Sequence, residues 1–196
     1  MRMTKTTLTI LAHLSAILIF LFMIGCKKEV SKTEIAKGQK IIIDVEQRLK
    51  ELGIELYPPD APVANYVQTV RTGNLVFLAG HGPRKPEGGY ITGKVGRDID
   101  IEQGKEAARL TAISLLSSLK AEIGDLNKVR RIVRVFGMVN TDESFTAHPQ
   151  VINGCSDLLV SLFGDRGKHV RAAVGMVSLP MNISTEIEMI VEVQDR

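Results

Sequence analysis

The sequence has no tryptophan, only two cysteines and few aromatic residues, and these shortages exclude several classes of protein. Aromatic residues make up 5% of the 196 residues, which leaves little material for platforms that stack nucleic-acid bases. Cys26 and Cys155 are too few to build a disulfide framework. His81, His148 and His169 are scattered along the chain without an H-x-x-x-H pair, so the pattern predicts neither a metal site nor a bound cofactor.

The charge is close to balance and the apolar content is ordinary. The chain has 25 Lys and Arg against 22 Asp and Glu, a formal net charge of +3, and 44% hydrophobic residues. Such a balance excludes a strongly basic nucleic-acid-binding surface, an acidic tail and a disordered chain. The length fits one domain with a short appendage.

The first 25 residues have the features of a secretory signal peptide. They contain Arg2 and Lys5, no acidic residue, and an apolar run over residues 16–24. The segment Met23-Ile24-Gly25-Cys26 resembles a bacterial lipobox, in which the cysteine thiol is diacylated and becomes the new N-terminus. The alternative is an uncleaved anchor helix with an incidental cysteine. Either way, we expect a domain held on a membrane outside the cytoplasm, in the bacterial cell envelope.

A polar segment over residues 26–40 follows and is expected to be a linker between the lipid on Cys26 and the domain. The folded domain is expected to span residues 41–196. We therefore divide the chain into a lipoprotein-type signal peptide (1–25), a polar linker (26–40) and one domain (41–196).

The spacing of apolar residues predicts three helices and five strands. The helices are expected near residues 42–52, from Asp100 onward, and over 148–163. The strands are expected over residues 66–71, 75–79, 128–139, 170–177 and 185–193, with Thr72-Gly73-Asn74 as a three-residue hairpin loop between the first two. This order indicates an α+β fold, one sheet covered by two helices on one face. The other face must then be polar, or covered by another subunit.

Two features have alternative interpretations that the residues alone leave open. Basic residues in one predicted strand could contact phosphate or simply flank a buried strand: Lys128, Arg130, Arg131 and Arg134. Cys155 lies on the apolar stripe of its helix, which favours a buried structural thiol over a nucleophile. Neither a phosphate-binding loop nor a G-x-S-x-G nucleophile motif occurs in the sequence.

The last third of the chain contains the pattern most suggestive of a site. Alternation along residues 170–177 places Arg171, Ala173 and Gly175 on one face, which leaves a hollow with a cation at one end. In the final strand Glu186 and Glu188 share a face. A ligand site and a structural Arg–Glu pair on a solvated sheet face are equally compatible with this spacing.

These segments resemble the RidA/YjgF (L-PSP) family. The resemblance rests on R-A-A-V-G-M-V-S-L-P followed by E-I-E, on G-N-L-V-F-L-A-G in the hairpin, and on the positions of Tyr66, Gln68 and Asn153. It covers roughly residues 41–193. The segment E-Q-R-L-K-E-L-G-I looks like that of a family branch distinct from the best-known deaminases.

The resemblance implies a chorismate-mutase-like fold, a homotrimer and ligand clefts between subunits. It also implies hydrolysis of reactive 2-imino and enamino acids to 2-oxo acids and ammonia. Arg171 would bind the substrate carboxylate, and Glu186 would position the attacking water. The remaining positions that would line the cleft are Tyr66, Gly80, Asn153 and Ala173.

Two departures from the family pattern accompany this resemblance. Ala173 stands where the deaminases usually have cysteine, and Gly80-His81-Gly82-Pro83 replaces a more usual G-Q-I-P. The alternatives are a lipid-tethered trimer that binds a small carboxylate without turnover and, on the older L-PSP name, a ribonuclease. The near-neutral charge and the shortage of aromatic residues argue against nucleic acid as a partner.

Overall fold

Local sequence signals set the ends of the helices. The computed structural model describes residues 43–62 and 64–195, so the predicted signal peptide, Cys26 and the polar linker lie outside the described residues. Helix α3 spans Val45–Glu51, α4 spans Ile101–Ile123 and α5 spans His148–Phe163. At the start of α4, Asp100 and Gln103 form a capping box, in which each side chain accepts a hydrogen bond from the other's backbone N–H. Gly124 and Gly164, both with positive φ, follow the last residues of α4 and α5.

Five strands form one mixed sheet in the order β1-β2-β5-β3-β4. They are β1 (Thr69–Thr72), β2 (Leu75–His81), β3 (Val129–Asn140), β4 (Val170–Met176) and β5 (Thr185–Val193). Strands β3 and β4 are parallel because α5 connects them, whereas the other neighbours are antiparallel. Three short 3₁₀ helices complete the described elements, and η3 (Pro180–Asn182) joins β4 to β5.

The first hairpin is tighter than the sequence suggested. Thr72 pairs with Leu75, so the loop contains only Gly73 and Asn74 and the expectation of a three-residue loop is wrong. Thr72 remains in the ladder because Gly73 takes φ of +57°, a conformation typical of two-residue hairpin turns. Strand β1 starts at Thr69, which leaves Tyr66 outside it.

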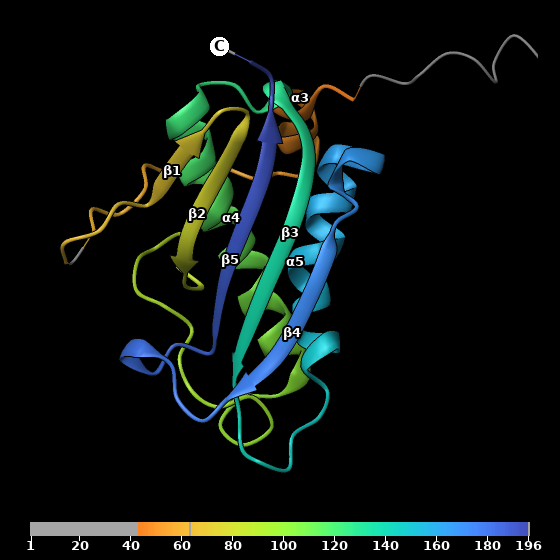
Figure 1. Cartoon of the computed structure of the whole chain (residues 1–196). Coiled ribbons are helices and arrows are strands. Elements are labelled where there is room, and N and C mark those ends of the chain that lie inside the picture. The colour runs from red at the N-terminus through yellow and green to blue at the C-terminus, as the bar shows by residue number, and fades with distance from the viewer. Residues whose placement is uncertain (1–42, 63, 196) are drawn as a thin grey trace, which may run out of the picture. The chain divides into compact units, whose positions relative to one another are not determined.

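The sheet is covered by helices on one face, as expected. Helices α4 and α5 lie side by side behind the sheet in the view of Figure 1, and the other face points toward the viewer. One apolar stripe of α4 is completely buried against the sheet: Ala108, Ala112, Leu115, Leu116 and Leu119. The inner face of the central strands contributes Ile132, Val135, Ile187, Met189 and Val191. The α+β architecture read from the sequence is therefore confirmed.

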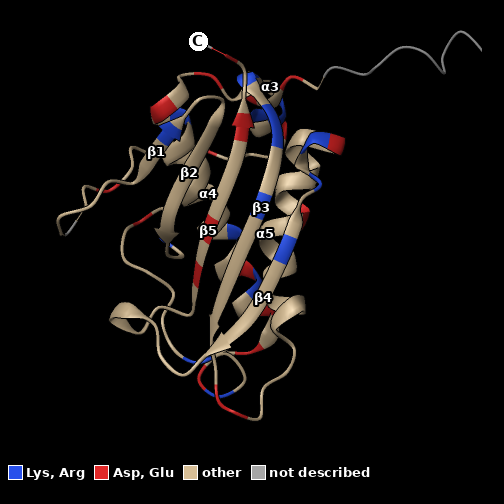
Figure 2. Ribbon diagram, in the orientation of Figure 1, with Lys and Arg blue, Asp and Glu red and all other residues tan. Residues whose placement is uncertain are grey.

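The uncovered face combines apolar and charged side chains. Val70 and Phe77 pair across β1 and β2 and are 54% and 40% exposed. A small apolar cluster lies lower on this face around Met138, Leu179 and Ile183. Figure 2 shows acidic residues along β5 beside basic residues along the neighbouring strand β3. No described helix is both long and apolar enough to cross a membrane.

Close contact between α4 and α5 requires a glycine. A Cβ atom on Gly154 would collide with the backbone carbonyl oxygen of Lys105 on α4. The two helices therefore approach each other with backbone against backbone at this point. This close contact helps to bring the outer side of α5, which carries Asn153 and Ser156, to a defined position beside β4.

We expect Gly154→Ala to destabilise the fold by about 1–3 kcal/mol, the usual cost of overpacking a close-packed core. The gain in intrinsic helix propensity from alanine, up to about 1 kcal/mol, opposes this cost. Urea unfolding followed by circular dichroism measures the net change. Val160→Ala, on the exposed side of the same helix, is the control and should cost less. Unchanged stability of Gly154→Ala would contradict the close helix contact.

Candidate functional site

Arg171 is held on the helix-covered side of the sheet by two residues of α5. Its Nη1 donates to Asn153 Oδ1 and to Ser156 Oγ, both at 2.9 Å. His169 Nδ1 lies 2.6 Å from the Gly167 carbonyl oxygen and so carries the ring hydrogen. Its Nε2 then accepts from the Ser156 hydroxyl at 3.0 Å. This chain of contacts orients the guanidinium, and no hydrogen bond among the described residues uses its Nε or Nη2. That edge is free to bind a carboxylate.

The two small residues that share a strand face with Arg171 have different surroundings. Ala173 is partly buried and packs against the main core. Gly175 faces His148, because a Cβ atom on Gly175 would collide with the imidazole Nε2. The Ala173 side chain is thus packed against the core, and the Gly175 end of the predicted hollow is occupied by the His148 ring.

Glu186 lies on the opposite, uncovered face of the sheet. It alternates with Thr185 and Ile187, which are completely buried under α4 and α5. A Cβ atom on Gly80 would collide with Glu186 Oε1, so the carboxyl group rests on the Gly80 backbone. Burial, with a smaller contribution from the nearby Glu188 charge, raises the pKa of Glu186. A carboxyl group with a raised pKa is suited to exchange protons.

Arg171 and Glu186 are therefore not a pair within one chain. Arg171 contacts α5, whereas Glu186 points to the side without helices. The interpretation as a structural Arg–Glu pair on one solvated face is wrong. Side chains alternate between faces along each strand, but that alternation alone did not reveal which face of β4 would meet α5.

Glu186, Gly80 and Tyr66 do come together, around a pocket of about 320 Å³. The lining of the pocket also includes residues that the sequence analysis did not name. All three tyrosines of the protein line it, of which only Tyr66 was expected: Tyr57, Tyr66 and Tyr90. Asn153 and Ala173 lie with Arg171 instead. One chain thus presents two separate groups of predicted site residues. A usable sequence signal for the pocket was the unusual His81, which lines it.

His81 connects the pocket to α4. The register between β2 and β5 shifts between Leu78 and His81, and this bulge turns the imidazole inward. Nδ1 lies 2.7 Å from the Ala79 carbonyl oxygen, and Nε2 lies 2.7 Å from Ser118 Oγ. Because a carbonyl only accepts, Nδ1 carries the hydrogen and Nε2 accepts from the Ser118 hydroxyl. Burial lowers the pKa of His81, which keeps the ring neutral.

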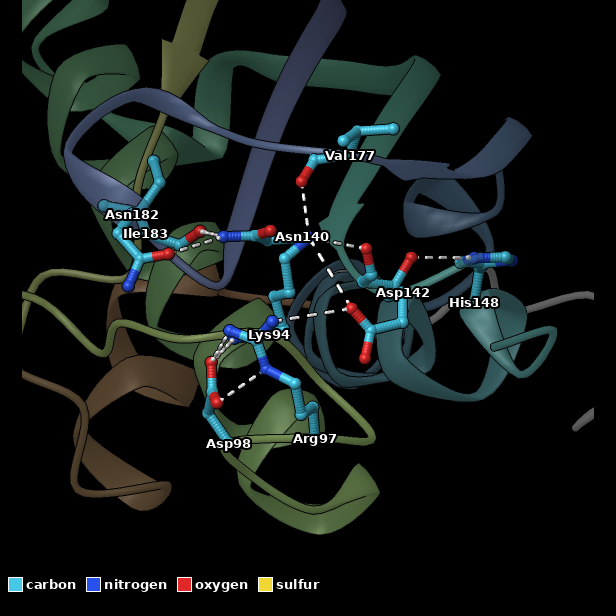
Figure 3. Close-up of polar contacts among 10 residues, drawn as sticks. Lys94, Arg97, Asp98, Asn140, Asp142, His148, Val177, Asn182 and Ile183 are labelled. Carbon is cyan, nitrogen blue, oxygen red and sulfur yellow. Dashed lines mark hydrogen bonds and ion pairs between the residues drawn. The ribbon is translucent and has the colours of Figure 1, made fainter. Parts of the chain in front are cut away.

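A polar network around Lys94 holds the loops at one end of the sheet, as Figure 3 shows. Lys94 Nζ donates to the carbonyl oxygens of Thr141 and Val177, which follow β3 and β4. Asn140 Nδ2 donates to Asn182 Oδ1 and to the Ile183 carbonyl, both at 3.1 Å. These contacts fix η3 and Ile183, and Ile183 is part of the pocket wall.

Other groups that could do chemistry are inert or isolated. Cys155 is completely buried, and this burial raises the pKa of its thiol to about 12, so the structural interpretation is confirmed. Within residues 43–62 and 64–195, no three His, Cys, Asp or Glu side chains cluster in a way that could hold a metal ion.

Comparison with known proteins identifies the family of this chain. Residues 46–193 match the family described as "YjgF/chorismate_mutase-like, putative endoribonuclease". The chain belongs to the YjgF/RidA family. This confirms the family resemblance and the chorismate-mutase-like fold that it implied.

Individual relatives match most of the length of this YjgF/RidA chain. Protein TCP17 of Trypanosoma cruzi is 38% identical over 152 residues, 77% of this chain and 95% of TCP17. Atu1372 of Agrobacterium tumefaciens, a protein of unknown function, is 43% identical with a TM-score of 0.71, over 77% of this chain and 94% of its own. The YjgF gene product of E. coli is 23% identical with a TM-score of 0.50, over 70% and 94% of the two chains, and shares the fold.

The neutral, buried His81 predicts a specific pH dependence of stability. Its pKa in the folded chain lies below the ordinary value of 6.5, so the unfolded chain binds a proton first as the pH falls. Above about pH 6.5 the His81 ring is neutral in both states, and the folded chain keeps its full free energy of unfolding. As the pH falls from there toward the pKa of His81 in the folded chain, the free energy of unfolding decreases. His81→Gln can still donate and accept but does not titrate. Its unfolding free energy should fall less than that of the wild type between about pH 7 and pH 5.

Urea unfolding at several pH values measures this difference. The pKa of His169 is also lowered, mainly by burial, but that residue is present in both proteins and its contribution cancels. Parallel pH profiles for the two proteins would contradict a neutral His81 in the fold.

Proposed function

We propose that this protein is a hydrolytic deaminase of reactive 2-imino and enamino acids, acting at clefts between the subunits of a homotrimer. The observation that carries this proposal is the separation of the site into two half-sites on opposite faces of one chain. Arg171 with Asn153 forms one, and Glu186 with Gly80 and Tyr66 forms the other. Each half-site lacks what the other has, so a second copy completes the site.

Hydrolysis requires binding of the substrate carboxylate, activation of a water molecule and transfer of protons to the nitrogen. The two half-sites supply these functions. The Arg171 guanidinium binds the substrate carboxylate through its free Nε and Nη2 edge, a charge-assisted bidentate contact. Glu186 accepts a proton from water as the water oxygen bonds to the imine carbon. This proton passes to the imine nitrogen and gives a carbinolamine. The proton of the new hydroxyl group then moves to the amine nitrogen through Glu186 as the C–N bond breaks and the C=O bond forms, so that a 2-oxo acid and ammonia leave. The raised pKa of Glu186 suits both proton transfers.

The uncovered sheet face supports the assembly. It exposes Val70 and Phe77, and it carries acidic residues on β5 next to basic residues on β3 (Figure 2). Such a mixture suits contact with a second copy, since apolar area is buried and opposite charges can pair. No cofactor is needed, because the imine carbon is already electrophilic.

A binding protein without turnover is the second candidate, and Ala173 favours it. The deaminases that this chain resembles usually have cysteine at this position, so the cleft here lacks that thiol. The same Arg171 would then hold a small carboxylate. A ribonuclease activity is suggested by the words "putative endoribonuclease" in the family's description, while the net charge of +3 gives little attraction for RNA.

Imine hydrolysis tests the enzyme directly. An amino-acid oxidase generates 2-iminopropionate, and the release of pyruvate is followed. The wild-type protein should accelerate the release of pyruvate. Arg171→Ala should weaken binding of the substrate carboxylate by about 2–5 kcal/mol. Arg171→Lys should recover part of this binding free energy. Glu186→Gln should keep binding and lose turnover. If the wild-type protein binds the carboxylate but does not accelerate the release of pyruvate, the deaminase proposal is refuted and the second candidate, a binding protein without turnover, stands.

Mixing two inactive variants tests whether the half-sites meet across subunits. When equal amounts of Arg171→Ala and Glu186→Gln chains assemble at random into trimers, about a quarter of all clefts combine an intact Arg171 with an intact Glu186. Activity should therefore return on joint refolding of the full-length chains, together with a trimer mass by light scattering in detergent. A preparation of each variant refolded alone is the control. Failure to regain activity in a proven mixed trimer would place both residues in one subunit's site.

We also propose attachment to the cell envelope through a lipid on Cys26. The support is the lipobox-like Met23-Ile24-Gly25-Cys26 after a short apolar run. Several acyl chains hold a protein stably on a membrane, whereas one holds it weakly. Radiolabelled palmitate given to a bacterial host should enter the wild-type protein and not Cys26→Ser. Cys155→Ser is the matched control and should label like wild type; equal labelling of Cys26→Ser would refute the proposal.

A further inference from the structure

The pocket beside Glu186 is larger than a three-carbon acid requires. Its volume of about 320 Å³ lies at the lower end of the range for pockets that enclose drug-sized ligands. Glu186 and Gly80, where the proposed reaction takes place, are at its wall. The remaining space has to receive another part of the substrate, and the part that varies among 2-imino acids is the side chain.

The walls of this pocket are flat and held in place. The Arg84 guanidinium lies over the Tyr57 ring at 4.5 Å from its centroid. The Tyr90 ring packs tightly on Gly82, where a Cβ atom would be 3.2 Å from Tyr90 Cδ1. The Tyr90 hydroxyl donates to Asp60 Oδ2 at 3.1 Å. Fixed aromatic side chains in the wall of a pocket favour a flat, largely apolar ligand group.

Three hydroxyl groups of the pocket, those of Tyr57, Ser114 and Ser118, have their hydrogens engaged in hydrogen bonds. Ser114 Oγ lies 3.1 Å from the Gly82 carbonyl oxygen and 3.2 Å from that of Leu110, so its hydrogen goes to a carbonyl. Ser114 must then accept from the Tyr57 hydroxyl at 2.7 Å. The Ser118 hydroxyl donates to His81 in the same way. Tyr57 Oη and Ser118 Oγ therefore have free lone pairs and no free hydrogen.

Gln68 and Arg84 also affect what a ligand group meets in this pocket. Gln68 lines the pocket, and its Oε1 is buried without a hydrogen-bond partner among the described residues. Arg84 is the one cation among the described lining residues, and it is paired with Asp60 at 3.1 Å. A ligand donor that reaches Tyr57 Oη or Gln68 Oε1 therefore meets an oxygen with a free lone pair.

We infer that this pocket selects the substrate side chain, and that it takes a flat, aromatic-sized group with a hydrogen-bond donor, such as a phenol or an indole. The inference rests on the proposed function, since Arg171 of a second copy would hold the carboxylate. Tyr57 is the acceptor for the donor, because it is partly exposed to the pocket whereas Ser118 is buried.

Titration calorimetry of the full-length protein in detergent with a matched set of 2-oxo acids tests this selection. The set is pyruvate, phenylpyruvate and 4-hydroxyphenylpyruvate, of which the last two differ by one hydroxyl group. The hydroxylated acid should bind about tenfold more tightly than phenylpyruvate, the effect of one well-placed hydrogen bond, and phenylpyruvate more tightly than pyruvate. Equal affinity for the two aromatic acids would contradict the preference for a hydrogen-bond donor. Equal affinity for all three acids would contradict the inference that the pocket selects the side chain.

Tyr57→Phe locates the contact. It removes the hydroxyl and keeps the ring, so the preference for 4-hydroxyphenylpyruvate should disappear while phenylpyruvate binds as before. A preference that persists in this variant would overturn the role of Tyr57. Arg171→Ala separates the two proposals: it should weaken all three acids alike. If it weakens none of them, or if no 2-oxo acid binds to the wild type, the proposed function fails first.

Discussion

The arrangement of this protein depends on a sheet that is packed against helices on one face only. Residues along a strand alternate between faces, so one-sided cover places neighbouring side chains in two different environments. Arg171 is directed toward α5 and is held there by Asn153 and Ser156, while Glu186 points to the uncovered side. The two charges cannot neutralise each other within one chain. Each therefore remains available to a ligand or to a second copy.

Glycine residues provide the close approaches that the site needs. Gly154 lets the backbones of α4 and α5 meet, which sets the place of Asn153 and Ser156 beside β4. Gly80 does the same for the Glu186 carboxyl group on the other face, which rests directly on the backbone. In both places a single methyl group would occupy space that another atom already fills. The geometry of the two half-sites thus depends on the absence of a side chain at Gly154 and Gly80.

The pocket beside Glu186 shows how distant segments of one chain build a single binding surface. The segment before β1 contributes Tyr57 and Asp60, the loop after β2 contributes Arg84 and Tyr90, and α4 contributes Ser114 and Ser118. The β2 bulge joins these parts, because it turns His81 inward to Ser118 and leaves Gly80 beside Glu186. The network around Lys94 fixes the remaining wall through η3 and Ile183 (Figure 3).

The amino-acid sequence by itself determined the helices, the strands and the family. Periodicity and end signals are local: the Asp100–Gln103 capping box, the glycines after α4 and α5, and the alternation of β5 act over a few residues. The tight hairpin loop escaped this reasoning because one residue more or less in a turn depends on strand pairing, as Thr72 with Leu75 shows. Only the tertiary structure decided which face of each strand met the helices, and hence that Arg171 and Glu186 lie apart. It also decided that Tyr57, His81 and Ser118 share one pocket, since their proximity comes from packing between segments far apart in the chain.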